Sequence, residues 1–284
     1  MHEPALRAAA FGSDPLPDPA ALRGGGSPRE RLLAAVVLGA QGRYAAAARL
    51  LGGLRAGEDP LLASLAASTL GAHRRQLGGH RQARALDGEA FAQAVALESD
   101  PDPDGLDAAG ARADALLGLA ADNLALGRLK AARRLAERAA EQDAGWRARV
   151  RGGWVGAEIE LAAGQGAAAV PHAERAFRTA RERGARRHAV KSGIVLAVAL
   201  RAAGGPDHRE ISDDLVGNAM ATAEECELLS LLWPATLVAA DLRPGHAEEY
   251  RFRTTEVLHA VLRSADPCGR RIAGESPWVP APGG

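Results

Sequence analysis

The sequence predicts an all-α protein built from stacked antiparallel helical hairpins, an α-solenoid closed by further helices at its C-terminal end. The first observation is composition: alanine makes up nearly a quarter of the 284 residues, whereas aromatic residues make up only 4%. Alanine heads the helix scale, while sheets are built largely from aromatic and β-branched residues. The second observation is a glycine-centred pattern that recurs between apolar segments of helix length.

The N-terminal boundary of the folded domain is predicted at Ser27. Residues 1–26 hold several prolines and three consecutive glycines, so we expect a flexible arm there. Ser27 is followed by Pro28 and, three positions on, by Glu30, which together form the signature of a capping box at a helix start. One helical domain is therefore expected over residues 27–265.

A repeated pattern, glycine and then alanine five places later, organises the first three quarters of the chain. The four pairs are Gly42 and Ala47, Gly78 and Ala83, Gly127 and Ala132, and Gly164 and Ala169. The glycines are 36, 49 and 37 residues apart, and a weaker fifth unit turns at Gly204. A small residue lies seven places before each of the four glycines, at Ala35, Gly71, Ala120 and Ala157.

These features predict hairpins in which glycine ends the first helix in a left-handed conformation and small residues let the paired helices approach closely. A chain with 33 glycines produces such matches by chance, so the near-regular interval between helix-length segments carries the argument. An irregular helical bundle is the alternative.

At these residues, over about 28–205, the chain resembles the tetratricopeptide repeat family, whose period is about 34 residues. Tyr44 is the best-preserved large aromatic residue, and the proline that usually ends each unit is absent. The resemblance implies a right-handed solenoid that holds a peptide or protein segment in a concave groove formed by the first helix of each unit. The inward positions that match carry Arg75, Arg151, Trp154, Glu158, Lys191, Ile194 and Arg201. No asparagine lies among them, so a chaperone-type carboxylate clamp is not implied.

An acidic insertion of about 12 residues separates the second and third units. It begins like a calcium loop, with aspartates at alternate positions: Asp100, Asp102 and Asp104. Such a loop needs a bidentate glutamate at its twelfth position, where this chain has Ala111. We therefore expect a mobile, metal-free linker whose Asp107 caps the next helix.

No complete catalytic motif is present in the sequence. The segment Gly164-x-Gly166-x-x-Ala169 fits a dinucleotide fingerprint, but it follows the predicted helix 146–163 rather than a strand. The eight histidines form no zinc motif, and neither a phosphate loop nor a Gly-x-Ser-x-Gly elbow occurs. The sequence predicts no catalytic residue, no cofactor and no metal site, and hence a protein that is not an enzyme.

Cys226 and Cys268 are too few for a disulfide framework, so a reducing, cytoplasmic location is expected. No stretch of 18 apolar residues suggests a membrane span, and no signal-peptide core is seen at the N-terminus.

The formal charge is zero, from 35 basic and 35 acidic side chains, but the charges are segregated. Residues 128–191 carry 15 basic and 7 acidic side chains, whereas residues 207–249 carry 2 and 10. Such a dipolar molecule can steer an acidic protein partner or associate with itself. The alternative is that the charged outer faces serve only solubility. Overall neutrality argues against membrane-surface and nucleic-acid binding.

Residues 206–265 are predicted to form C-terminal capping helices, the last an amphipathic helix over 245–264. Pro234 should kink or break one of them. The Pro/Gly-rich residues 266–284 should be a flexible tail, in which Trp278 either docks into the groove as a short linear motif or is incidental.

The sequence therefore favours a non-enzymatic protein-interaction module, regulatory or scaffolding, that binds a peptide or protein segment in its concave groove. The alternatives are a ligand sensor or enzyme with a pocket between the repeats and the C-terminal helices, and a transcription-accessory factor.

Overall fold

A computed structural model describes residues 2–14 and 16–280, and within them the protein is all-α, with fourteen α-helices, two short 3-10 turns and no strand. The helices are α1 (Glu3–Phe11), α2 (Pro28–Ala40), α3 (Tyr44–Arg55), α4 (Pro60–Gln76), α5 (His80–Ala94), α6 (Ala108–Ala125), α7 (Leu129–Ala140), α8 (Gly145–Ala162), α9 (Gly166–Glu182), α10 (Arg186–Ala203), α11 (Pro206–Glu225), α12 (Leu229–Leu242), α13 (Ala247–Arg263) and α14 (Pro267–Glu275). The predicted fold class is confirmed.

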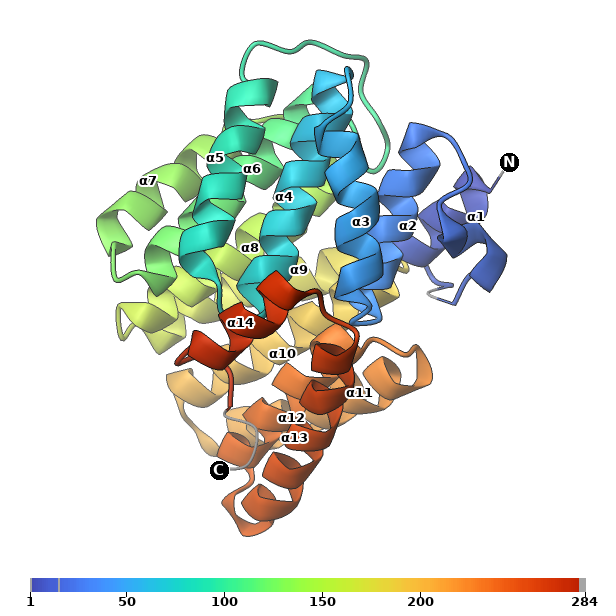
Figure 1. The fold of residues 1–284 in the computed structure, drawn as a ribbon. Coiled ribbons are helices and arrows are strands. Elements are labelled where there is room, and N and C mark those ends of the chain that lie inside the picture. The colour runs from blue at the N-terminus through green and yellow to red at the C-terminus, as the bar shows by residue number, and fades with distance from the viewer. Residues whose placement is uncertain (1, 15, 281–284) are drawn as a thin grey trace.

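Successive helices pack as antiparallel hairpins, from α2–α3 through to α12–α13 (Figure 1). The first helices of the hairpins also pack on one another in order, α2 on α4, α4 on α6, and so on to α12. The array then returns on itself, because α12 packs against α2. The inner helices thus enclose a central space instead of lining an open groove.

The predicted glycine turns are confirmed at all four positions. Gly42, Gly78, Gly127 and Gly164 have φ values of 75°, 78°, 75° and 73°, and each joins the two helices of one hairpin. The left-handed region is accessible to glycine at no steric cost, which explains the residue at this point of each unit. The small residues that precede the turns are fully buried where their helices meet: Ala35, Ala120 and Ala157 are 0% exposed.

Pro234 was predicted to kink or break its helix, and α12 continues through it without a break. A proline inside a helix leaves the carbonyl four residues earlier without its usual N–H partner. Here that carbonyl belongs to Ser230, and it accepts a 2.7 Å hydrogen bond from the side-chain amide of Gln76 on α4. Because the orphaned acceptor is satisfied from outside, the helix is retained and α4 is joined to α12.

The N-terminal segment is not the flexible arm that its composition predicts. Residues 3–11 form α1, in which Leu6 and Phe11 are buried at 1% and 4% exposure. Arg7 in α1 pairs with Asp102 and Asp104, both at 2.7 Å. Apolar burial and ion pairing together hold the segment against α2 and α10.

The acidic insertion is likewise anchored rather than a solvated, mobile linker, because Asp102 binds both Arg7 and Arg29. One part of the prediction for this insertion is confirmed, namely that Asp107 caps the next helix. Its carboxylate accepts a 2.7 Å hydrogen bond from the backbone N–H of Gly110 at the start of α6.

The C-terminal segment also differs from the expected flexible tail. Asp266 caps α14 and pairs with Arg74 at 2.8 Å, and Ile272 and Ala273 are buried. Figure 1 shows α14 lying across the C-terminal end of α4. Residues 281–284 lie outside the described part of the chain.

Candidate functional site

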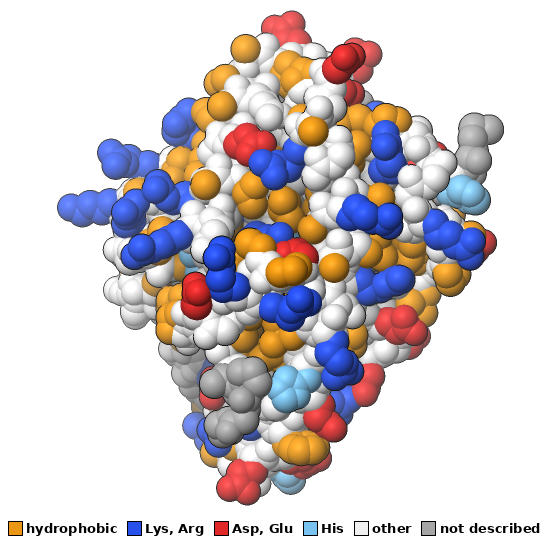
Figure 2. Space-filling model, in the orientation of Figure 1, with side chains coloured by type: hydrophobic (Ala, Val, Ile, Leu, Met, Phe, Trp, Pro, Cys, Tyr) orange, Lys and Arg blue, Asp and Glu red, His pale blue; other side chains and the backbone are white. Residues whose placement is uncertain are grey.

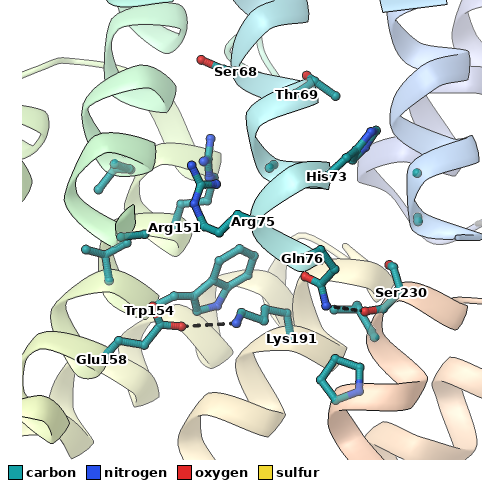
Figure 3. Close-up of a pocket in the computed structure, with 18 of the residues that line it drawn as sticks. Ser68, Thr69, His73, Arg75, Gln76, Arg151, Trp154, Glu158, Lys191 and Ser230 are labelled. Atoms are coloured by element: carbon teal, nitrogen blue, oxygen red, sulfur yellow. Dashed lines mark hydrogen bonds and ion pairs between the residues drawn. The ribbon is translucent and has the colours of Figure 1, made fainter. Parts of the chain in front are cut away.

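A central pocket of about 590 Å³ lies inside the ring of inner helices. All six inner helices, α2, α4, α6, α8, α10 and α12, contribute residues to its wall. Further lining residues come from elsewhere in the chain: Phe11 of α1, Tyr44 of α3, His80 of α5, and Trp278 and Val279 of the tail. Figure 3 shows polar side chains from α4, α8, α10 and α12 converging on this space. The volume falls in the range of pockets that take small molecules or the end of a peptide.

Five of the seven groove residues predicted from the sequence line this pocket, namely Arg75, Arg151, Trp154, Glu158 and Lys191. The other two do not. Ile194 is buried in the apolar core shared with α11 and α12. Arg201 lies near the end of α10, where its guanidinium donates a hydrogen bond to the carbonyl of Leu242. On α10 the residues that line the pocket are Arg187, His188 and Lys191, all in its first two turns, whereas Ile194 and Arg201 lie further along the helix.

Arg75 crosses the pocket wall from α4 and is held by two buried aspartates. It pairs with Asp87 of α5 and, at 2.8 Å, with Asp122 of α6. His80 approaches the same Asp122 carboxylate at 3.1 Å. Burial raises the pKa of Asp87 above its ordinary value, and the neighbouring Asp122 adds to the rise, while Arg75 opposes it. Arg75 is thus fixed in place by carboxylates from α5 and α6, the two helices that follow α4.

A second fixed group of charges lies at the N-terminal end of α8. Asp114 of α6 pairs with Arg147 at 2.8 Å and also with Arg151. Burial alone would raise the pKa of Asp114, but the two guanidinium groups hold it below its ordinary value. Arg147 also donates to the backbone carbonyl of Asp104 at 2.7 Å. One carboxylate is therefore shared by two cations.

Arg187, the second residue of α10, is the exception among the cations of the pocket. Its Nε atom is buried with no hydrogen-bond partner, and within residues 2–14 and 16–280 no carboxylate pairs with it. Burial, together with repulsion by Arg147 and Arg151, lowers the pKa of Arg187 to about 10. The nearby Asp114 carboxylate opposes this lowering but does not pair with Arg187. The side chain remains charged at neutral pH, so a positive charge without a directly paired carboxylate in the described part of the chain faces the cavity.

Aromatic rings form one wall of the pocket beside these charges. The Trp154 indole stacks on the His188 ring, with centroids 5.7 Å apart, and donates a 2.7 Å hydrogen bond to Ser192. Lys191 lies 5.9 Å from the centre of the Trp154 ring and pairs with Glu158 at 3.2 Å, as Figure 3 shows. Burial lowers the pKa of His188 well below its ordinary value, so its ring is neutral at pH 7.

Another part of the wall, formed by residues of α3, α4 and α12, carries polar groups that have no partner among the described residues. Tyr44 is 1% exposed and Trp233 is 5% exposed, and neither the Tyr44 hydroxyl nor the Trp233 indole N–H has a hydrogen-bond partner among the described residues. His73 lies against Tyr44, with ring centroids 5.2 Å apart, and burial lowers its pKa to about 3. Buried polar groups are rarely left unpaired, so the Tyr44 hydroxyl and the Trp233 N–H are exceptions that a small rearrangement of this wall would have to expose before a ligand could bind them.

The tail reaches one edge of the pocket. Trp278 and Val279 both contribute to its lining, and the Trp278 ring meets His80 edge-on at 6.1 Å. Val279 is buried, whereas Trp278 remains 58% exposed. The tryptophan therefore lies at the rim rather than filling the interior.

Sequence reasoning missed Arg147 and Arg187. Each lies four residues before a predicted groove residue, Arg151 and Lys191 respectively, and so on the same helix face. Extending the set of inward-facing positions on α8 and α10 by one helical turn towards the start of each helix would have found both residues. Tyr44 and Trp233 could not be found this way, because they enter the pocket only when the ring closes.

The site therefore combines a cationic interior with aromatic walls. Among the residues that the structure describes, no group of three or more His, Cys, Asp or Glu side chains is arranged to hold a metal ion. No helix in the described ranges is long and apolar enough to cross a membrane.

Comparisons with known proteins add little to this description. No family model and no curated protein sequence matches the chain. Among solved structures, the crystal structure of BtubC (BKLC) from P. vanneervenii is similar, with 17% sequence identity and a TM-score of 0.43, over 85% of this chain and 94% of that one. A likeness at this level identifies no function.

Proposed function

We propose that this protein is a non-enzymatic binding module whose central pocket holds a short peptide segment of a protein partner. The observation that carries the proposal is the pocket itself, lined by every inner helix and furnished with both aromatic rings and cations. Aromatic and arginine side chains in a desolvated setting supply most of the energy of typical binding sites.

The arrangement of charges supports binding rather than catalysis. Asp114 and Glu158, the two carboxylates that line the pocket, are each held by a cation. A general base must be within reach of a substrate proton and free to accept it. The Thr69 hydroxyl donates to the carbonyl of Leu65 at 2.7 Å, so its proton is already engaged in a hydrogen bond.

A second candidate, a sensor of a small organic molecule, is supported by a different observation. Helix α12 and the tail residues Trp278 and Val279 contribute to the pocket, so a bound molecule would contact the repeats and the C-terminal segment together. Such contacts would couple occupancy to the position of the tail.

Selection of displayed random seven-residue peptides against the full chain tests the first candidate. Enriched peptides should bind the wild type and lose at least tenfold in affinity with Ala121→Trp, which places an indole in the pocket. Ala221→Trp, on the exposed face of α11, is the matched control and should bind normally. Peptides that bind Ala121→Trp as well as the wild type would place the binding site elsewhere.

A further inference from the structure

We propose that the pocket contains a carboxylate-binding subsite centred on Arg187, so that its ligand carries a single negative charge next to an apolar or aromatic group. The inference rests on the proposed use of the pocket as a binding site and adds the chemistry that it selects.

Charge balance inside the pocket identifies the subsite. Five cations line the cavity: Arg75, Arg147, Arg151, Arg187 and Lys191. Four of them have a carboxylate partner within the described part of the chain, and Arg187 alone has none. Burying an unpaired charge is costly, and proteins keep such charges where a ligand or function compensates for them.

The surroundings of Arg187 favour an anion further. Arg147 and Arg151 share the single charge of Asp114, which leaves this end of the pocket positive. Arg187 and Arg147 also belong to the first turns of α10 and α8, where the partial positive charge of a helix lies.

The chemistry of the subsite points to a carboxylate with an apolar neighbour. A guanidinium binds a carboxylate through two parallel hydrogen bonds. Arg187 is the one cation of the pocket without a carboxylate partner in the described part of the chain, so a ligand with one carboxylate would complete the pairing. The Trp154 ring, which is half-buried and stacks on His188, offers an apolar surface for the rest of the ligand.

Two matched pairs of probes test the inference and distinguish the sources of such a carboxylate. Phenylacetate and phenylacetamide have the same shape but differ in charge, as do acetyl-Ala-Phe-Glu-Ala-amide and its Gln counterpart. Binding would be measured by calorimetry at pH 7 and low salt with the full chain. In at least one pair the charged member should bind at least fivefold more tightly. A preference within the phenyl pair indicates a free organic acid, and one within the peptide pair indicates an acidic side chain.

Substitution of the arginine assigns the preference to the subsite. Arg187→Gln should reduce the preference for the charged probe to less than twofold, and Arg187→Lys should retain part of that preference. Arg201 is a cation outside the pocket, so Arg201→Gln should leave the preference unchanged. Arg187→Gln should fold with an unfolding temperature at or above that of the wild type, because it removes a cation repelled by Arg147 and Arg151.

Several results would overturn the inference. These are equal binding of charged and neutral members, a preference that survives in Arg187→Gln, tighter binding of phenyl phosphate than of phenylacetate, or no binding of any probe at millimolar concentration. Equal binding that Ala121→Trp abolishes would refute the carboxylate subsite and leave the pocket's binding role intact. Failure of the peptide selection would count against that role itself.

Discussion

The side-chain amide of Gln76 donates a 2.7 Å hydrogen bond to the backbone carbonyl of Ser230, 154 residues further along the chain. Ser230 needs this donor because Pro234 cannot supply the N–H that an uninterrupted helix would offer. A single polar contact thus satisfies the orphaned carbonyl in α12 and joins the second hairpin to the sixth.

This relationship predicts a coupled pair of substitutions. Gln76→Ala should lower the free energy of unfolding by about 1–3 kcal/mol, because it leaves a buried carbonyl without a partner. In a Pro234→Ala background the same change should cost less than half as much, since the new N–H at position 234 can bond to the Ser230 carbonyl. Urea unfolding of the four proteins in this double-mutant cycle measures the coupling. Equal costs in the two backgrounds would show that Gln76 does not compensate for the proline.

The turn glycines predict a graded series of alanine substitutions. Gly127→Ala should cost about 1 kcal/mol, because φ is +75° and no atom lies within 4 Å of the added methyl group. Gly42→Ala should cost more, since at the same φ its Cβ would lie 2.8 Å from a methyl group of Val261.

Gly52→Ala is the matched control. Gly52 lies inside α3 with open space around it, so this substitution should stabilise the protein by about 0.5–1 kcal/mol. Thermal unfolding of the three variants measures the order. A Gly42→Ala protein as stable as Gly127→Ala would contradict the close packing of the first turn on α13.

Burial of His73 and His188 predicts a loss of stability in mild acid. Burial lowers the pKa of His73 to about 3 and that of His188 well below its ordinary value of 6.5. Below about pH 6.5 the unfolded chain binds protons that these residues cannot bind in the folded state. Their contribution to stability is therefore present above pH 6.5 and declines as the pH falls, by up to about 1.4 kcal/mol per unit for each histidine.

The raised pKa of Asp87 acts in the opposite direction, because its folded form takes up a proton first as the pH falls. The variant His188→Gln isolates the histidine contribution. Between pH 6 and 5 it should lower the slope of the unfolding free energy against pH by the amount that corresponds to the uptake of almost one proton on unfolding. An unchanged slope would show that the ring is protonated in the folded protein.

The packing of α1 predicts that the N-terminal segment belongs to the folded domain. Phe11→Ala should destabilise the protein by about 3–5 kcal/mol, because the ring is 4% exposed and packs against the guanidinium of Arg147 at 4.6 Å. Leu16→Ala is the control, since Leu16 is 43% exposed and should cost less than about 0.5 kcal/mol. Similar unfolding midpoints for the two variants would mean that α1 is dispensable.

The hairpins were predictable because their signals are local. A left-handed turn needs glycine, and the small residues at fixed distances from it mark where two helices meet. The groove residues on α4, α8 and the start of α10 were implied by the resemblance to tetratricopeptide repeats, which assigns inward positions to the first helix of each unit. These parts of the fold and site depend only on residues within one or two hairpins.

The closure of the ring and the packing of both ends were not predictable in this way. Gln76 and Ser230 are far apart in the chain, and nothing in the local sequence announces that one compensates for a proline near the other. Proline and glycine in residues 1–26 signal turns, but they do not exclude a short helix when Leu6 and Phe11 find an apolar surface. Long-range contacts decide these cases.

The segregation of basic and acidic residues was visible in the sequence, and the fold places the two kinds of charge on different parts of the surface. Figure 2 shows Lys and Arg side chains gathered at the edge formed by α5 and α7, while acidic side chains are prominent towards the end that α11 and α13 occupy in Figure 1.

The most direct test of the account asks whether a bound peptide occupies the central pocket. The chain has four tryptophans, of which Trp154 and Trp233 line the pocket interior, Trp278 lies at its rim, and Trp146 does not line it. Fluorine NMR of the 5-fluorotryptophan protein, with each signal assigned by a Trp→Phe variant, reports on all four during titration with a selected peptide. If a peptide occupies the pocket, the Trp154 and Trp233 signals should shift with the calorimetric binding curve and the Trp146 signal should move least. Saturable binding that leaves Trp154 and Trp233 unmoved would contradict it.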